Sequence, residues 1–162
     1  MTPLVRAAIA LAALGLAATS WWALARSRDD PTPRTLLLSG FGPFGAYTTN
    51  PSWDVARALD GERIAGLRVV AARLDVTWAD APVQLEAALA EHAPDLVLSL
   101  GVAPTPAIRL ERVARNRDAG REPDVAGVLR AGTPIREGGP EMLASRLPLE
   151  RLRTGLQAAG FE

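Results

Sequence analysis

Residues 35–45, Thr-Leu-Leu-Leu-Ser-Gly-Phe-Gly-Pro-Phe-Gly, join a short apolar run to a glycine-rich loop. An apolar run of this length that ends at glycine is typical of a strand buried on both faces of a parallel sheet. Asn50-Pro51-Ser52 then predicts the start of a helix, with Ser52 as its cap, and Asp60-Gly61 predicts its end near Leu59. Strand, loop and helix in this order favour an α/β sheet.

The alternation of strand and helix continues along the chain. Three further strands are predicted, at residues 67–76, 95–101 and 108–114. Three further helices are predicted, at residues 79–92, 140–146 and 149–159. Of the strands, residues 95–101 form the clearest buried one. We therefore expect a three-layer α/β/α fold with a mostly parallel sheet.

Composition excludes several kinds of site. The 162 residues carry 18 basic and 18 acidic side chains, and all the basic ones are arginine, with no basic patch to attract a nucleic acid. The absence of cysteine excludes disulfides, thiolate metal sites and a thiol nucleophile within these residues. The single histidine, His92, excludes a multi-histidine metal site, and its place near the end of a predicted helix indicates a structural role.

The N-terminal segment is uncharged from residue 7 to residue 25 and ends in Trp-Trp-Ala-Leu-Ala. As a hydrophobic helix its length just spans a hydrocarbon core, and Ala23-Leu24-Ala25 has the small-x-small form of a signal-peptidase site. Residues 1–28 are therefore predicted to be a signal peptide or a membrane anchor, residues 29–34 a linker, and residues 35–162 the α/β domain. An exported, periplasmic or membrane-anchored location follows, and a buried helix of the domain is the weaker alternative.

Two motifs, in this order and at this spacing, carry a family resemblance. The first is the loop at residues 40–45 followed by Asn50-Pro51-Ser52-Trp53, and the second is residues 108–116, Ile-Arg-Leu-Glu-Arg-Val-Ala-Arg-Asn. A weaker match, Asn-x-Asp-x-x-Arg-x-Pro-Asp, continues through residues 116–124. Together they resemble pyroglutamyl peptidase I, a family of cysteine-type omega peptidases. These hydrolases, thiol proteases by mechanism, remove N-terminal pyroglutamate from peptides with a Cys-His-Glu triad and are usually cytoplasmic.

The resemblance implies a substrate pocket in the first motif. Phe41 and Phe44 would sandwich the flat lactam ring, and Asn50 would line the pocket. Aromatic faces and a few hydrogen bonds suit a neutral pyrrolidone ring, and the pocket is expected to contain no charge. From the residues alone, an alternative is that the two phenylalanines only seal the end of the sheet against a helix.

The resemblance also implies two active-site residues beyond the loop. Glu111 would be the triad carboxylate, which orients the histidine that activates the thiol, and Arg121 would support a developing oxyanion. The alternative for Glu111 is a surface glutamate paired with Arg109 or Arg112. No metal or organic cofactor is implied.

The triad cysteine and histidine are missing from these residues, so the chain resembles the N-terminal portion of the family. We expect an α/β domain that is incomplete at its C-terminus, is inactive unless a second chain or segment supplies both groups, and is poorly soluble alone. A non-catalytic binding module that retains the pyroglutamyl pocket is the alternative. An unrelated α/β ligand-binding domain is a third alternative, which requires both motif matches to be accidental.

Overall fold

The computed structural model describes residues 34–105, 107–120 and 122–161. The predicted leader and nearly all of the predicted linker lie outside these residues. Within the described part of the chain, no helix combines the length and the apolar character needed to cross a membrane.

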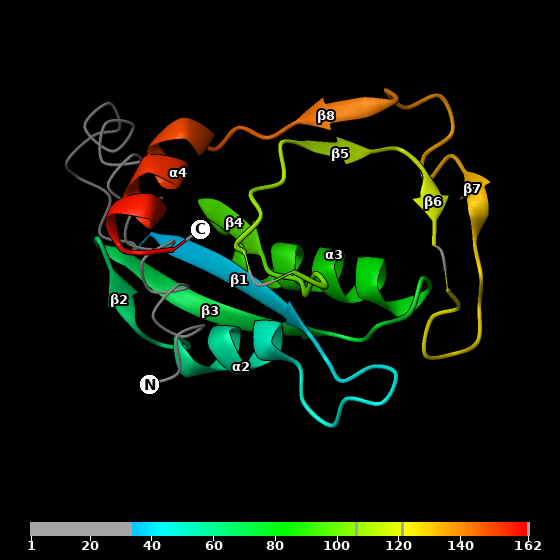
Figure 1. Ribbon diagram of the computed structural model, residues 1–162, viewed down its shortest axis with the longest axis horizontal. Helices are drawn as coiled ribbons and strands as arrows, with labels where there is room; N and C mark the ends of the chain where they lie inside the picture. Colours follow the sequence, from blue (N-terminus) through cyan, green and yellow to red (C-terminus); the bar gives the residue numbers. More distant parts are fainter. Residues whose placement is uncertain (1–33, 106, 121, 162) are drawn as a thin grey trace.

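A four-stranded sheet forms the centre of the fold (Figure 1). Strand β1 (Thr35–Phe41) lies between β3 (Leu67–Leu74) and β4 (Leu96–Ser99) and is parallel to both. The short β2 (Arg63–Ile64) pairs antiparallel with the outer edge of β3, which gives the order β2-β3-β1-β4. The predicted mixed α/β fold with a mostly parallel sheet is confirmed.

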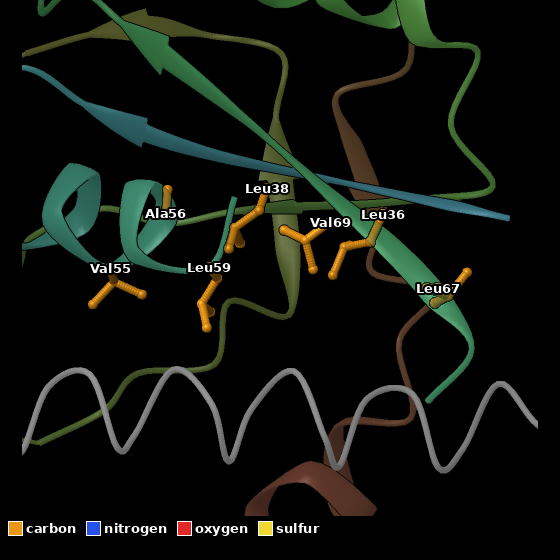
Figure 2. Close-up of a cluster of buried hydrophobic side chains, with 7 residues drawn as sticks. All are labelled: Leu36, Leu38, Val55, Ala56, Leu59, Leu67 and Val69. Carbon is orange, nitrogen blue, oxygen red and sulfur yellow. The ribbon is translucent and has the colours of Figure 1, made fainter. Parts of the chain in front are cut away.

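Helix α2 (Pro51–Ala58) covers one face of this sheet. Figure 2 shows the resulting core, in which Val55, Ala56 and Leu59 face side chains of the two central strands. The strand residues in this cluster are Leu36, Leu38, Leu67 and Val69. Alternation along a strand explains why Leu36 and Leu38 share one face, so burial of apolar side chains fixes α2 against β1 and β3.

Helix α3 (Asp80–His92) also packs on β3 and β1. The connection from β1 through α2 to β3 and that from β3 through α3 to β4 cross the sheet in opposite directions. Right-handed crossovers in opposite directions place their helices on opposite faces of the sheet. Leu37 and Val70, which point away from the α2 face by strand alternation, are buried accordingly.

The chain beyond β4 runs as an extended arm and returns as a helix (Figure 1). In the arm, β5 (Val113–Arg115) pairs antiparallel with β8 (Met142–Ala144), and β6 (Asp118–Ala119) pairs antiparallel with β7 (Ala131–Thr133). Helix α4 (Leu149–Ala158) follows the arm, close to the span predicted. Every residue of β5 and β8 is exposed, so the arm adds little to the core.

Two predictions of secondary structure and one prediction of burial were wrong. Residues 108–112 are not in a strand, because pairing with β8 begins only at Val113. The helix predicted at residues 140–146 is instead β8, since cross-strand hydrogen bonds to β5 override a weak helical pattern. The strand predicted as the most buried, β4, is only half buried, because β1 is its one neighbour among the described strands and Val97 is 38% exposed.

Candidate functional site

The glycine-rich loop leaves the sheet at the carboxyl end of β1. Phe41 is the last residue of the strand, and the backbone N–H of Gly42 donates to the carbonyl of Leu74 at the end of β3 (2.8 Å). The half-buried Phe44 ring packs against Tyr47, with centroids 5.7 Å apart and planes at 48°. Ligands of open α/β sheets bind beyond the carboxyl ends of the strands, and this loop lies there.

Asn50 ties the loop to the start of α2. Its Oδ1 accepts from the backbone N–H of Ser52 (3.0 Å) and from the Ser52 hydroxyl (2.7 Å), and its Nδ2 donates to the carbonyl of Gly42 (2.8 Å). Asn50 is therefore the helix cap, and the prediction that Ser52 caps the helix was wrong. Asn50 is only 3% exposed, so these hydrogen bonds hold its side chain in one buried position.

Ser52 makes the second connection between helix and strand. Its hydroxyl accepts from the backbone N–H of Phe41 (2.9 Å). A Cβ on Gly40 would lie 2.4 Å from the carbonyl oxygen of Ser52, so only glycine permits the strand to approach the helix this closely. The sequence predicted Ser52 as the helix cap but gave no sign that its hydroxyl accepts from the Phe41 N–H.

The guanidinium group of Arg73 lies beside the same loop. A Cβ on Gly42 would lie 2.9 Å from Nη2 of Arg73, a residue of β3, so the guanidinium packs over the loop. Its carboxylate partner is Asp75, at 3.9 Å, and both side chains are about half exposed. No charge was expected in this region from the sequence. Arg73 was not foreseen because it reaches the loop from β3, which follows α2 in the sequence.

Glu111 is exposed on the segment between β4 and β5. Its carboxylate lies 3.2 Å from Nη2 of Arg109, and its side chain is 73% exposed. Among the described residues, no hydrogen bond or ion pair joins Glu111 to Phe41, Phe44 or Asn50. The structure thus places the three predicted pocket residues between the end of β1 and the start of α2, and it shows Glu111 in the ion pair with Arg109 that the alternative interpretation predicted.

A half-open pocket lies between the Glu111 segment and α4. It has a volume of about 320 Å³, and its walls come from the segment, from α4 and from Phe161. The lining residues are Ile108, Leu110, Arg112, Leu149, Glu150, Arg153, Leu156, Gln157 and Phe161. Arg109 and Glu111 do not line this pocket, and both are exposed.

Asn116 and Asp118, from the weaker match at residues 116–124, are occupied in structural hydrogen bonds. The Asn116 side chain bonds the backbone of Arg136 in both directions (2.7 and 2.8 Å), and Asp118 accepts from the Thr133 hydroxyl (2.8 Å). These contacts shape the arm. Arg121, the predicted oxyanion support, lies outside the described residues.

Asp124 connects the arm to the loop that follows β3. It accepts from the backbone N–H groups of Trp78 (2.8 Å), Val128 (2.8 Å) and Ala126 (2.9 Å). These hydrogen bonds, that from Trp78 first, and the charge of Arg130 hold the pKa of the Asp124 carboxyl below its usual range. The carboxylate therefore fastens the arm most firmly in its ionised form.

A mostly parallel sheet with an aromatic loop held at its carboxyl edge is the architecture of an open-sheet α/β protein, a class whose ligands bind at that edge. Residues 34–162 match the pyroglutamyl peptidase family, and the chain belongs to that family. The predicted family resemblance is confirmed.

Relatives from Chromobacterium violaceum, Pyrococcus furiosus and Bacillus amyloliquefaciens align with about four fifths of this chain. Pyrrolidone-carboxylate peptidase of Chromobacterium violaceum is 42% identical over 129 residues, which are 79% of this chain and 61% of that protein. A mutant pyrrolidone carboxyl peptidase from Pyrococcus furiosus superposes with a TM-score of 0.77 at 34% identity, covering 79% of this chain and 62% of that one. Pyroglutamyl peptidase I of Bacillus amyloliquefaciens gives 0.76 at 31% identity, with 80% and 62% covered. The chain spans about three fifths of the length of these relatives.

Proposed function

We propose that this chain is part of a cysteine-type omega peptidase that hydrolyses the amide bond after an N-terminal pyroglutamate of peptides. The observation that carries the proposal is the loop at residues 40–45, which Asn50 and Ser52 fix at the carboxyl edge of the sheet in a chain of this family. The relatives' names, pyrrolidone-carboxylate peptidase and pyroglutamyl peptidase I, give the substrate class.

The ring of the substrate is assigned to the aromatic loop. Phe41 and Phe44 are half buried, so part of each residue is accessible to a ligand. A flat, neutral lactam stacks well on such faces, and the Asn50 amide offers a hydrogen bond to it. Arg121 is assigned to stabilise negative charge on the carbonyl oxygen as the tetrahedral intermediate forms.

Glu111 is assigned to orient a histidine. Its exposed carboxylate can accept a hydrogen bond from an imidazole N–H, and Arg109 is a weak competitor because exposed ion pairs contribute little. The thiolate that attacks the pyroglutamyl carbonyl and the histidine that protonates the leaving amine are not among these 162 residues, whose one histidine, His92, pairs with Glu91. A further segment or a second chain must supply both, and without them the chain is inactive.

The proposal is tested by supplying the missing part covalently. Residues 34–162 are fused to the part of the Chromobacterium violaceum relative that lies beyond the aligned region, and hydrolysis of a fluorogenic pyroglutamyl amide is measured. We expect the fusion to be active and the 162-residue chain to be inactive. Glu111→Gln in the fusion should lower kcat by about 10²-fold or more, because an amide orients the histidine wrongly, whereas Glu122→Gln, at another exposed glutamate of the arm, should not.

The outcomes separate the two functional interpretations. An inactive but folded fusion that still binds the lactam ring would favour a non-catalytic pyroglutamyl-binding module. Full activity of the Glu111→Gln fusion would refute the assignment of the triad carboxylate.

The apolar run at residues 7–25 supports an exported or membrane-anchored location for the protein. Fractionation of cells that express the chain with a C-terminal tag tests this. A periplasmic or membrane-bound product is expected, and an uncleaved product in the cytoplasm would refute it.

A further inference from the structure

We propose that Ser52 is a positioning residue, which fixes the orientation of the Asn50 amide and the conformation of the aromatic loop before the lactam ring binds. This inference rests on the proposed function, because it concerns the same pocket. Ser52 itself is 5% exposed and lies behind the loop, so it acts through Asn50 and Phe41 rather than on the substrate.

The orientation of the Asn50 amide follows from the donors around it. Oδ1 of Asn50 accepts from both the backbone N–H and the hydroxyl of Ser52. A flipped amide would point its NH2 group at the Ser52 N–H, which would then lose its acceptor. The NH2 group is therefore held on the side of Gly42, towards the loop.

This orientation leaves a donor for a ligand. The Nδ2 group carries two hydrogens, and among the described residues its acceptor is the Gly42 carbonyl. We assign the second hydrogen to the carbonyl oxygen of a bound lactam. Ser52 thus determines that Asn50 presents a donor, and not an acceptor, to the loop side.

The same hydroxyl fixes the backbone of the loop. A hydroxyl that donates to Asn50 Oδ1 (2.7 Å) uses its lone pair to accept from the Phe41 N–H (2.9 Å). The hydrogen bonds form a chain from Phe41 through Ser52 to Asn50 and on to Gly42. Hydrogen bonds in such a chain reinforce one another, so loss of the hydroxyl affects both ends of the loop.

Removing the hydroxyl should weaken ring binding more than it affects the chemical step. In Ser52→Ala, the Phe41 N–H loses its acceptor and Asn50 loses one of the donors that hold its orientation. Ser52→Thr keeps the hydroxyl and serves as the rescue variant. Thr49→Ala, at an exposed neighbour outside this network, is the matched control.

The experiment uses the fusion protein described above and two readouts. The first is the Kd of 2-pyrrolidone, the bare lactam ring, measured by calorimetry, and the second is KM and kcat for the pyroglutamyl amide. We expect Ser52→Ala to raise Kd and KM about tenfold, equivalent to about 1.4 kcal/mol, with kcat changed less than about threefold. Ser52→Thr should return Kd to within about threefold of the unaltered protein, and Thr49→Ala should change nothing.

Each result either supports or overturns the inference. A Ser52→Ala fusion that has a lower Tm but an unchanged Kd would overturn it, because the hydroxyl would then be merely structural. Failure of the unaltered fusion to bind 2-pyrrolidone would overturn it as well. A fusion that binds the ring in a Ser52-dependent way but does not hydrolyse the amide would support the positioning role while refuting the proposed peptidase.

Discussion

Replacement of Asn50 by alanine tests the structural account of the aromatic loop most directly. The change removes three side-chain hydrogen bonds at once, from the Ser52 N–H, from the Ser52 hydroxyl and to the Gly42 carbonyl. The site is nearly inaccessible to water, since Asn50 and Ser52 are 3% and 5% exposed, so water cannot easily replace these bonds.

The expected loss of stability is about 3 kcal/mol, summed from three contributions. Loss of an asparagine cap costs about 1 kcal/mol. The Gly42 carbonyl loses its donor and the Ser52 hydroxyl loses its acceptor in a buried place, at about 1 kcal/mol or more apiece. A loss of about 3 kcal/mol is a large part of the free energy of unfolding of a domain, which is roughly 5–15 kcal/mol.

Two companion variants divide this loss into its parts. Asn50→Ser keeps a capping oxygen but is too short to reach the Gly42 carbonyl, so about half of the loss is expected. Thr49→Ala, at the exposed neighbouring position, should be within about 0.5 kcal/mol of the unaltered protein.

The assay is urea unfolding of the fusion protein followed by far-UV circular dichroism. At a typical slope of about 2 kcal/mol/M, a loss of about 3 kcal/mol lowers the midpoint by about 1.5 M. A shift below about 0.5 M for Asn50→Ala, or equal shifts for Asn50→Ala and Thr49→Ala, would refute the claim that Asn50 holds the loop to α2.

Three further substitutions test other features. Gly40→Ala should lower stability by about 3 kcal/mol in the same urea assay, because its Cβ would lie 2.4 Å from the Ser52 carbonyl oxygen. Gly101→Ala is the control and should be tolerated, because a Cβ there would have no atom within 4 Å. Equal effects of the two variants would contradict the steric argument. Asp124→Asn should lower Tm at pH 7. Because the folded-state pKa of Asp124 is below its unfolded value, the carboxylate stabilises the fold fully above pH about 3.9, and this stabilisation is lost as the pH falls further. The Tm difference between the variant and the unaltered protein should therefore shrink below that pH. A difference that stays constant with pH would argue against this role of Asp124. Val97→Lys, on the exposed edge strand β4, should increase the soluble yield of the 162-residue chain, because charged residues on edge strands oppose strand-to-strand association. An unchanged yield would show that this edge does not cause aggregation.

The elements that could be predicted from the sequence are those whose signals are local. The apolar run that became β1 and the cap and breaker residues around α2 follow one another closely along the chain. Their burial against each other needs no knowledge of the rest of the chain. Asn50 and Ser52 are both good cap residues, however, and only the three-dimensional path of the loop decides that Asn50 accepts from the helix N–H group while Ser52 faces the strand.

The elements that could not be predicted depend on distant partners. Strand β8 exists because Leu143 lies opposite Ala114, a residue far earlier in the chain, and no local pattern marks that pairing. The half-buried state of β4 depends on its place at the edge of the sheet, which a run of apolar residues does not reveal. Arg73 reaches the loop by tertiary contact alone.

The candidate site also has a part that could be predicted from local sequence and a part that could not. The pocket loop is one continuous stretch, so its residues could be named together from the sequence. For Glu111 the sequence left two interpretations open, a triad carboxylate and a surface glutamate paired with Arg109 or Arg112, and the side chains that would decide for the first are not among these 162 residues. Taken alone, Glu111 looks like the exposed, arginine-paired glutamate that the structure shows.

Helix α4 and the segment that carries Glu111 form the walls of one pocket. Ile108, Leu110 and Arg112 line it together with Leu149, Leu156 and Phe161, while Glu111 is exposed beside them. Among the described strands none pairs with residues 108–112, so the support of this segment comes from α4 and Phe161 rather than from a sheet. A change of side chain in α4 would therefore reach the residues on either side of Glu111.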